Sequence, residues 1–427
     1  MKKRLIISAI LISLLISGIS YAAEKRFLSK KQVIDLALRQ NQKLDKLRQD
    51  IKIAQAKLGG AKSAFYPNIG LNSSYTRFKE KQRLTMSKNK NSFAVGLNLQ
   101  QPIFLGGQLW STYQQMQNNL KVAKLKLQEE KKKIKYQVLE QYYNILKVKK
   151  MIEVTKQQLK RIKQYLEVAK VNLEVGIATK TDVLQAKVNY NQAQQRLLQV
   201  KNRLQLAKLA LQNSLGISSQ VKLKFNKELN WQPVDIVDNP YQYALKNRIQ
   251  FDILKLQAKN LKLNLQRVRN KDKYPNLNLM INYQARDKEF TVKDGSLQLT
   301  LNLQYNLFDG GKDEAKIKEM TKSIDKFRIS QQQIEDQIRL QVKQTILNLK
   351  EARQRIKLNK LNLQKAKENL EHTKLKFKEG MITSLEMLGA ETTLKQVKTD
   401  YYQAIYDYNL AQAKLNMVLG KEEINND

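Results

Sequence analysis

The stretch LEVGIATKTDVLQA, at residues 173–186, returns as FKEGMITSLEMLGA at residues 377–390, and this repetition decides the fold. Glycine, threonine, an acid and leucine recur at one offset of 204 residues, and each copy later closes on Leu-Gly. Upstream, PIFLGGQ at residues 102–108 matches NLFDGGK at residues 306–312 with the same offset. Because this period far exceeds the roughly 20–50 residues of solenoid repeats, each copy is a whole structural unit and the chain is a duplication.

The N-terminus has the pattern of a secretory signal peptide. Lys2, Lys3 and Arg4 precede an apolar run, and Ser20-Tyr21-Ala22 is a small-x-small cleavage site. We therefore predict a signal peptide over residues 1–22, cleaved after Ala22. The apolar run is too short for a lasting membrane helix, and we expect no transmembrane helix in the mature chain. The chain has no cysteine, which excludes disulfides, thiol catalysis and an acylated N-terminal cysteine.

The net charge of +40 raises the question of a nucleic-acid partner. Export argues against one, and the lysines are dispersed along helical stretches rather than gathered in a basic arm. We predict solvated helix faces, no nucleic-acid partner, and anionic lipid as a non-specific neighbour. The single histidine, His372, has no second ligand nearby. We accordingly expect no metal and no cofactor.

Four short segments change from helical spacing to a period of two. The clearest places leucine at alternate positions from Leu297 to Leu303, between Gln298, Thr300 and Asn302. An apolar face opposite an uncharged polar face is typical of an outer-membrane barrel strand, although a half-buried sheet on a soluble core has the same alternation. The barrel is favoured because long amphipathic helix accounts for the rest of the chain. Four strands cannot close, so two chains would give eight strands and three would give twelve, and a water-filled channel favours twelve.

The remaining residues predict very long helices with a heptad seam, in which apolar residues recur at spacings of four and three. Glycine pairs stand where a strand meets the next helix, at Gly106, Gly107, Gly310 and Gly311. The predicted organisation is a signal peptide (1–22); a first repeat (23–216) of helix, β-hairpin (67–102) and long helical hairpin (107–215); a linker or equatorial segment (217–238); a second repeat (239–420) of helix, β-hairpin (275–308) and long helical hairpin (311–419); and a C-terminal tail (421–427).

In order and duplication, these motifs resemble the TolC-like outer-membrane efflux protein family over essentially the whole mature chain. The resemblance implies a mainly helical homotrimer, with a twelve-stranded membrane β-barrel continuing into a twelve-helix α-barrel tunnel in the periplasm. It implies a channel and not an enzyme: the exit duct of a tripartite efflux or type I secretion system in the cell outer membrane, in contact with outer-membrane lipid. Its implied partners are a periplasmic adaptor, or membrane fusion protein, and an inner-membrane transporter of the RND, ABC or MFS type.

The resemblance also places a gate at the tips of the helical hairpins. Family members carry an acidic ring a few residues after the second glycine; Glu386 keeps the first acid, whereas Gly389 stands at the second. The family's latch of tyrosine, arginine and aspartate becomes Phe377, Ile382 and Asp182, so we expect closure to use apolar packing of Phe377 and Ile382. The expected adaptor contacts at the tips are Gly176, Thr179, Gly380 and Thr383.

The same tip acids have a purely structural explanation. Thr179 with Asp182, and Thr383 with Glu386, fit the capping box, in which the acid at the third helical position bonds the backbone at the helix start. We predict capping at both tips, and a gate role for Glu386 in addition.

Two other functions fit parts of the sequence. A secreted structural coiled coil, such as an adhesin stalk, shares the heptads and the signal but does not explain four matched strands. It would appear in the soluble periplasm or the medium. A periplasmic polyanion-binding protein rests on charge alone and predicts salt-dependent retention on heparin.

Overall fold

The computed structural model describes residues 26–27, 29–77, 91–218, 221, 223–225, 228–287, 294–379 and 381–421. The predicted signal peptide, Gly380 and most of the predicted C-terminal tail lie outside these residues. The chain forms two compact units that cut across the two sequence repeats. The first unit comprises residues 1–44, 131–247 and 340–427, and the second comprises residues 45–130 and 248–339.

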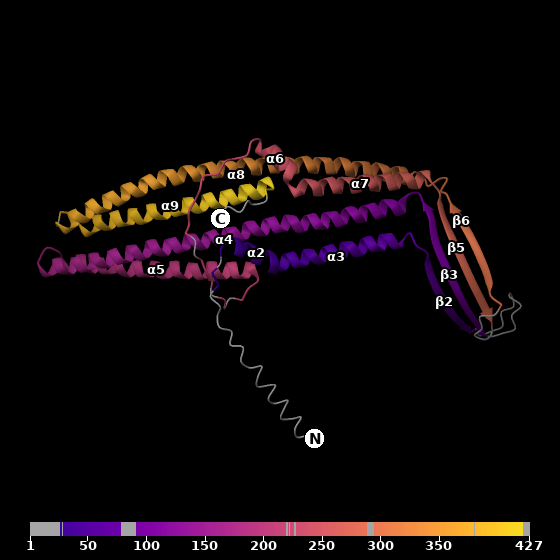
Figure 1. Ribbon diagram of the computed structural model, residues 1–427, viewed down its shortest axis with the longest axis horizontal. Helices are drawn as coiled ribbons and strands as arrows, with labels where there is room; N and C mark the ends of the chain where they lie inside the picture. The colour runs from indigo at the N-terminus through magenta and orange to yellow at the C-terminus, as the bar shows by residue number, and fades with distance from the viewer. Residues whose placement is uncertain are drawn as a thin grey trace, which may run out of the picture. The chain divides into compact units, whose positions relative to one another are not determined.

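A four-stranded antiparallel sheet belongs to the second unit. Its strands lie in the order β2 (Asn68–Arg77), β3 (Asn91–Leu105), β5 (Asn276–Asp287) and β6 (Ser296–Gln304), so the central pair joins the two repeats (Figure 1). Along most of its length the register aligns apolar with apolar and polar with polar residues; Gln101 opposite Leu279 is one exception. Two neighbouring rows are Ile69–Leu99–Ile281–Leu299 on the apolar face and Gly70–Asn98–Asn282–Gln298 on the polar face.

The apolar face of this sheet is open. The side chain of Leu299 is 67% exposed, and the leucines on either side of it on the same face of β6 are similarly uncovered. β6 ends at Gln304, four residues before the end of the predicted β-hairpin (275–308). The reason is its partner: Gln304 pairs with Asn276, where β5 begins, so the backbone pairing between β5 and β6 ends there.

Each repeat opens with two helices, where the sequence predicted one. α2 (Lys30–Gln40) precedes α3 (Gln42–Ser63), and α6 (Pro240–Asn247) precedes α7 (Ile249–Lys273). At the first break Asn41 is extended, and its side-chain amide donates to the Ser214 carbonyl at 3.1 Å while its oxygen accepts from the Lys43 amide at 2.9 Å. These bonds replace the backbone hydrogen bonds that a continuous helix would form at this position. A capping box starts α2: the Ser29 hydroxyl accepts from the Gln32 amide at 3.3 Å, and the Gln32 side chain accepts from the Ser29 amide at 2.9 Å.

The long helices repeat without a gap. α4 (Gln108–Glu174) and α8 (Lys312–Lys378) each have 67 residues, and α5 (Lys180–Leu215) and α9 (Ser384–Leu419) each have 36. Each of these long helices therefore maps onto its counterpart at the sequence offset of 204. α4 with α5, and α8 with α9, form the two helical hairpins (Figure 1). The mainly helical class with a small antiparallel sheet is confirmed.

Glycines with positive φ connect the sheet to the long helices. Gly106 and Gly107 have φ of 56° and 77°, and Gly310 and Gly311 have φ of 69° and 84°, values that side chains rarely adopt. In the second copy Asp309 adds a cap that the sequence analysis missed. Its carboxylate accepts from the amides of Gly311, Lys312 and Asp313 at 2.8–3.1 Å, and these bonds lower the pKa of Asp309.

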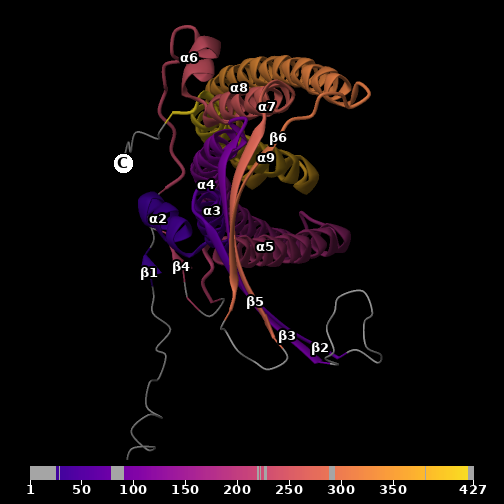
Figure 2. The same cartoon turned by 90° about the vertical axis from the view of Figure 1, so that its right-hand side faces the viewer.

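The segment between the repeats belongs to the first unit. β4 (Leu223–Lys224) pairs in parallel with β1 (Arg26–Phe27), a two-stranded sheet that the sequence did not predict (Figure 2). Further along, Trp231 lies edge-on to Tyr408 of α9, with ring centroids 5.3 Å apart, and the Tyr408 hydroxyl accepts from the Val234 amide at 2.9 Å. Within the described ranges, no helix is long and apolar enough to cross a membrane.

Candidate channel gate at the hairpin tips

The tip of the first hairpin is a tight turn followed by a capped helix. After α4 ends, Gly176 adopts φ of 76°, and the Ile177 amide donates back to the Asn172 carbonyl at 2.8 Å. Thr179 then caps α5: its backbone amide and hydroxyl donate to Asp182 at 2.9 and 2.7 Å. These bonds from the Thr179 hydroxyl and amide lower the pKa of the exposed Asp182 carboxyl. The predicted capping box is confirmed.

The second tip has the same cap at the start of α9. The Thr383 amide and hydroxyl donate to Glu386 at 2.8 and 3.0 Å, and the Glu386 amide donates to the Thr383 hydroxyl at 3.3 Å. The backbone and hydroxyl bonds from Thr383, followed by the nearby Lys376, lower the pKa of Glu386. The carboxylate is therefore charged at neutral pH and faces solvent. Capping is confirmed here too; the gate role of Glu386 stays a prediction.

Phe377 and Ile382 lie together just behind this second tip. Phe377 is buried at the end of α8, Ile382 packs against the same cluster, and the ring of Tyr165 from α4 meets Phe377 edge-on at 6.0 Å. The cluster connects α4, α8 and α9 of one chain. Its buried members are Ala366, Leu370, Phe377, Met387, Ala390 and Leu394.

A buried acid beside this cluster escaped the sequence analysis. Glu391 of α9 is fully buried, and its Oε1 accepts from Arg161 Nε at 2.5 Å and from the Tyr165 hydroxyl at 2.9 Å. Its second oxygen, Oε2, is buried without a hydrogen-bond partner among the described residues. Burial and the adjacent Glu391 carboxylate raise the pKa of Tyr165, so its hydroxyl stays a donor. Arg161, Tyr165 and Glu391 form what we call the α4–α9 tie.

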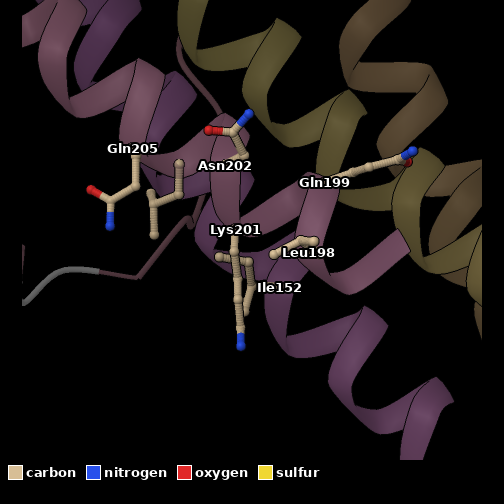
Figure 3. A pocket seen from close by; sticks show the side chains of 7 residues that line it. Ile152, Leu198, Gln199, Lys201, Asn202 and Gln205 are labelled. Atoms are coloured by element: carbon tan, nitrogen blue, oxygen red, sulfur yellow. The ribbon is translucent and has the colours of Figure 1, made fainter. Parts of the chain in front are cut away.

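Further from the tips, α5 carries a shallow hollow beside α4. Ile152 of α4 and residues of α5, among them the largely exposed Leu198, line it, and the polar side chains around the rim point outward (Figure 3). The lining contains one ionisable group, Lys201, and no acid. No group of residues in the described ranges has the composition of a metal site. The hollow therefore has the character of an uncovered helix surface.

The profile of the family described as outer membrane efflux protein matches residues 33–217 and 242–421, both repeats almost in full. The outer membrane channel CmeC from Campylobacter jejuni is similar in structure, with a TM-score of 0.82 and 17% identity over 96% of this chain and 92% of that one. The outer membrane protein VceC from Vibrio cholerae has a TM-score of 0.79 and 17% identity over 92% and 96%. The open MtrE outer membrane channel from Neisseria gonorrhoeae has a TM-score of 0.79 and 15% identity over 92% and 89%.

Among curated proteins, no sequence matches this chain. The duplicated hairpins, the open sheet and these comparisons together define an outer-membrane efflux channel. The chain belongs to the outer membrane efflux protein family.

Proposed function

We propose that three copies of this chain assemble into the exit duct of a tripartite efflux or type I secretion system. In this proposal the three sheets join into one twelve-stranded barrel, and the helical hairpins form the periplasmic tunnel. The hairpin tips meet a periplasmic adaptor, which couples the channel to an inner-membrane transporter. The tip residues offered to the adaptor are Gly176, Thr179, Gly380 and Thr383, with Gly380 outside the described residues.

The sheet is the observation that carries this proposal. Its outer strands, β2 and β6, each have one neighbour in the sheet, and its apolar face is open to the surroundings. An unpaired strand edge is not tolerated in hydrocarbon, where each unsatisfied backbone group costs several kcal/mol. Joining β6 of one chain to β2 of the next satisfies both edges, and three chains leave room for a water-filled lumen.

The test of assembly separates this function from a secreted coiled coil. Membranes extracted with detergent should yield a heat-modifiable trimer on a denaturing gel, and the boiled sample should run as a monomer. Recovery of the chain in the soluble periplasm or the medium would overturn the proposal.

We assign Glu386 as the charged group of the gate, with three copies forming one acidic ring. Phe377 and Ile382 back the ring from within the chain, in place of a hydrogen-bonded latch. Asp182 occupies the equivalent capped position in the first hairpin.

Substitution of Glu386 by glutamine tests the ring without removing the cap, because glutamine also fits a capping box. Single-channel recordings in planar bilayers should show higher anion conductance or weaker block by multivalent cations. Glu379→Gln removes a neighbouring exposed acid that lies outside the cap, and should change neither property. Identical recordings for Glu386→Gln and the unmodified channel would remove Glu386 from the gate and leave its capping role intact.

A further inference from the structure

The polar face of the four-stranded sheet is almost free of charge. Among the described residues of β2, β3, β5 and β6 that lie on this face, Arg286 is the one charged side chain. It stands opposite Ala94, at the end of the sheet furthest from the helices. Charged residues make up 27% of the whole chain, so composition alone does not explain this neutrality.

The membrane does not impose a neutral polar face either. The apolar face, which includes Leu299, has to lack charge because it meets hydrocarbon. The polar face encloses water in the proposed barrel, where charged side chains are tolerated and tune selectivity. An uncharged lining is therefore a property of this lumen in particular and calls for a functional explanation.

Carboxamide groups take the place of charges on this face. An amide carries both donor N–H groups and an acceptor oxygen, so it can bond to an anion or to a cation. Because the lining has no net charge, it retains neither kind of ion in preference. Asparagine or glutamine occurs on every strand, as in Asn72, Asn98, Gln100, Asn282, Gln298 and Asn302.

Two glycines let the amides of β2 and β3 lie flat on the sheet. Gly70 pairs with Asn98, and Gly96 pairs with Asn72. A Cβ on Gly70 would lie 2.6 Å from Asn98 Oδ1, and one on Gly96 would lie 2.8 Å from Asn72 Oδ1. Each asparagine side chain therefore occupies the space above its glycine, along the sheet and not across the lumen, which keeps the lumen wide at this level.

We propose that the barrel lumen at the level of Asn98 is an exit that does not sort solutes by charge. The substrates that it accepts are then water-soluble molecules of either sign, as well as neutral ones. Sorting by charge falls to groups that a substrate meets earlier, among them the proposed Glu386 ring. This inference rests on the proposed trimeric channel and adds the class of substrate that its exit accepts.

The position of Arg286 defines where the lumen is neutral. Asn98 pairs with Asn282, four residues from Arg286 on β5, which is about 13 Å along the strand. The Debye length at physiological ionic strength is about 8 Å, so the field of Arg286 is largely screened at that level. Gln284, on the same face, is two residues from Arg286 and about 7 Å away, inside the screening length. The two levels can be compared within one channel.

Cysteine accessibility tests the proposal, because the chain has no cysteine of its own. Trimers of Asn98→Cys in lipid vesicles are treated with an anionic sulfonate or a cationic trimethylammonium methanethiosulfonate. Each rate is divided by the rate of the same reagent with free mercaptoethanol, and the two normalised rates should agree within about threefold. Thr300→Cys, on the same face of β6, is a second variant and should give the same result. Rates that differ by more than about tenfold at both positions would overturn the inference.

Two further variants control for the face and for the sensitivity of the assay. Leu99→Cys, on the apolar face, should react with neither reagent, and reaction as fast as at Asn98→Cys would remove Asn98 from the lumen and overturn the inference. Gln284→Cys should favour the anionic reagent severalfold, and adding Arg286→Gln should abolish that preference. A preference at Asn98→Cys as large as at Gln284→Cys would also overturn the inference, because the charge of Arg286 would then reach the whole lumen.

Failure of this inference and failure of the proposed function give different results. A heat-modifiable trimer whose Asn98→Cys thiol reacts with one of the two reagents alone would contradict the neutral exit and leave the channel in place. Absence of the trimer for the unmodified chain would overturn the proposed function, and the exit with it.

Discussion

Replacing Glu391 with glutamine removes one negative charge from a fully buried position and leaves the shape of the side chain unchanged. Glutamine can still accept from Arg161 and Tyr165 through its oxygen. Its amide nitrogen would take the place of Oε2, which has no partner among the described residues, and so gains nothing. The substitution therefore isolates the charge of the α4–α9 tie.

The expected cost follows from the two bonds to Oε1. A hydrogen bond to a charged group contributes about 1.5–3 kcal/mol, and a neutral one about 0.5–1.5 kcal/mol. The Tyr165 bond becomes neutral and loses about 1–1.5 kcal/mol, the Arg161 bond keeps its cationic donor, and Arg161, mostly buried, loses its counter-charge. We expect the free energy of unfolding of the first unit to fall by about 3 kcal/mol, which lowers its melting temperature by roughly 6–12 °C.

Tryptophan fluorescence gives the assay, because Trp231 packs on Tyr408 in the first unit while Trp110 belongs to the second. A Trp110→Phe background makes Trp231 the sole reporter during thermal unfolding in detergent. Glu368→Gln, on the exposed acid paired with Lys365, is the matched control and should shift the transition little.

A paired replacement checks the cause. Arg161→Met combined with Glu391→Leu removes both charges and fills the space with apolar atoms, which should recover most of the lost stability. The reasoning fails if Glu391→Gln has the same melting temperature as the Glu368→Gln control. It also fails if the double variant is less stable than a variant carrying only one of its two substitutions.

Two further predictions concern the sheet and the equatorial end of α9. Leu299→Lys places a charge on the open apolar face, where a lysine at the bilayer centre costs about 2–4 kcal/mol, so trimer recovered from outer membranes should fall sharply. Thr300→Lys, one residue on and facing the polar side, should assemble normally; equal recovery would contradict a lipid-facing leucine row. Burial, then Glu140 and Asp407, raises the pKa of Tyr406 to about 12 from 10.0. Because the folded chain keeps a proton that the unfolded chain loses, this contribution to stability is complete below about pH 10 and disappears towards pH 12. The difference in tyrosinate absorbance between the unmodified protein and Tyr406→Phe should change with a midpoint near pH 12. A midpoint near pH 10 would contradict the assignment.

Local patterns predicted most of the secondary structure because local physics determines it. Alternation identified the strands, and the caps at Ser29, Thr179 and Thr383 appear where threonine or serine precedes an acid or glutamine by three residues. The break at Asn41 was not predictable in this way. No glycine or proline marks it, and its stabilising bond reaches Ser214, far along the chain.

The α4–α9 tie eluded prediction for a similar reason. In the sequence, nothing distinguishes Glu391 from the other acids of a charged helix, and its partner Arg161 lies 230 residues earlier. The available signal is its position: Met387, Ala390 and Leu394 are buried seam residues on the same face of α9, so an acid among them is displaced from solvent. Recognising the partner requires the register between two helices, which only the folded chain supplies.

The tie and the proposed gate acid share one helix, and this makes their roles separable. Glu386 stands at the start of α9 and Glu391 five residues later, about 7.5 Å along a rigid helix. Because the helix is rigid, a displacement of Glu391 also moves the start of α9. The charge of Glu386, by contrast, acts only on the ions that pass the hairpin tip. Glu391→Gln should therefore change both melting and conductance, and Glu386→Gln should change conductance alone. If Glu391→Gln lowers stability and leaves conductance untouched, the tie holds the chain together without positioning the gate.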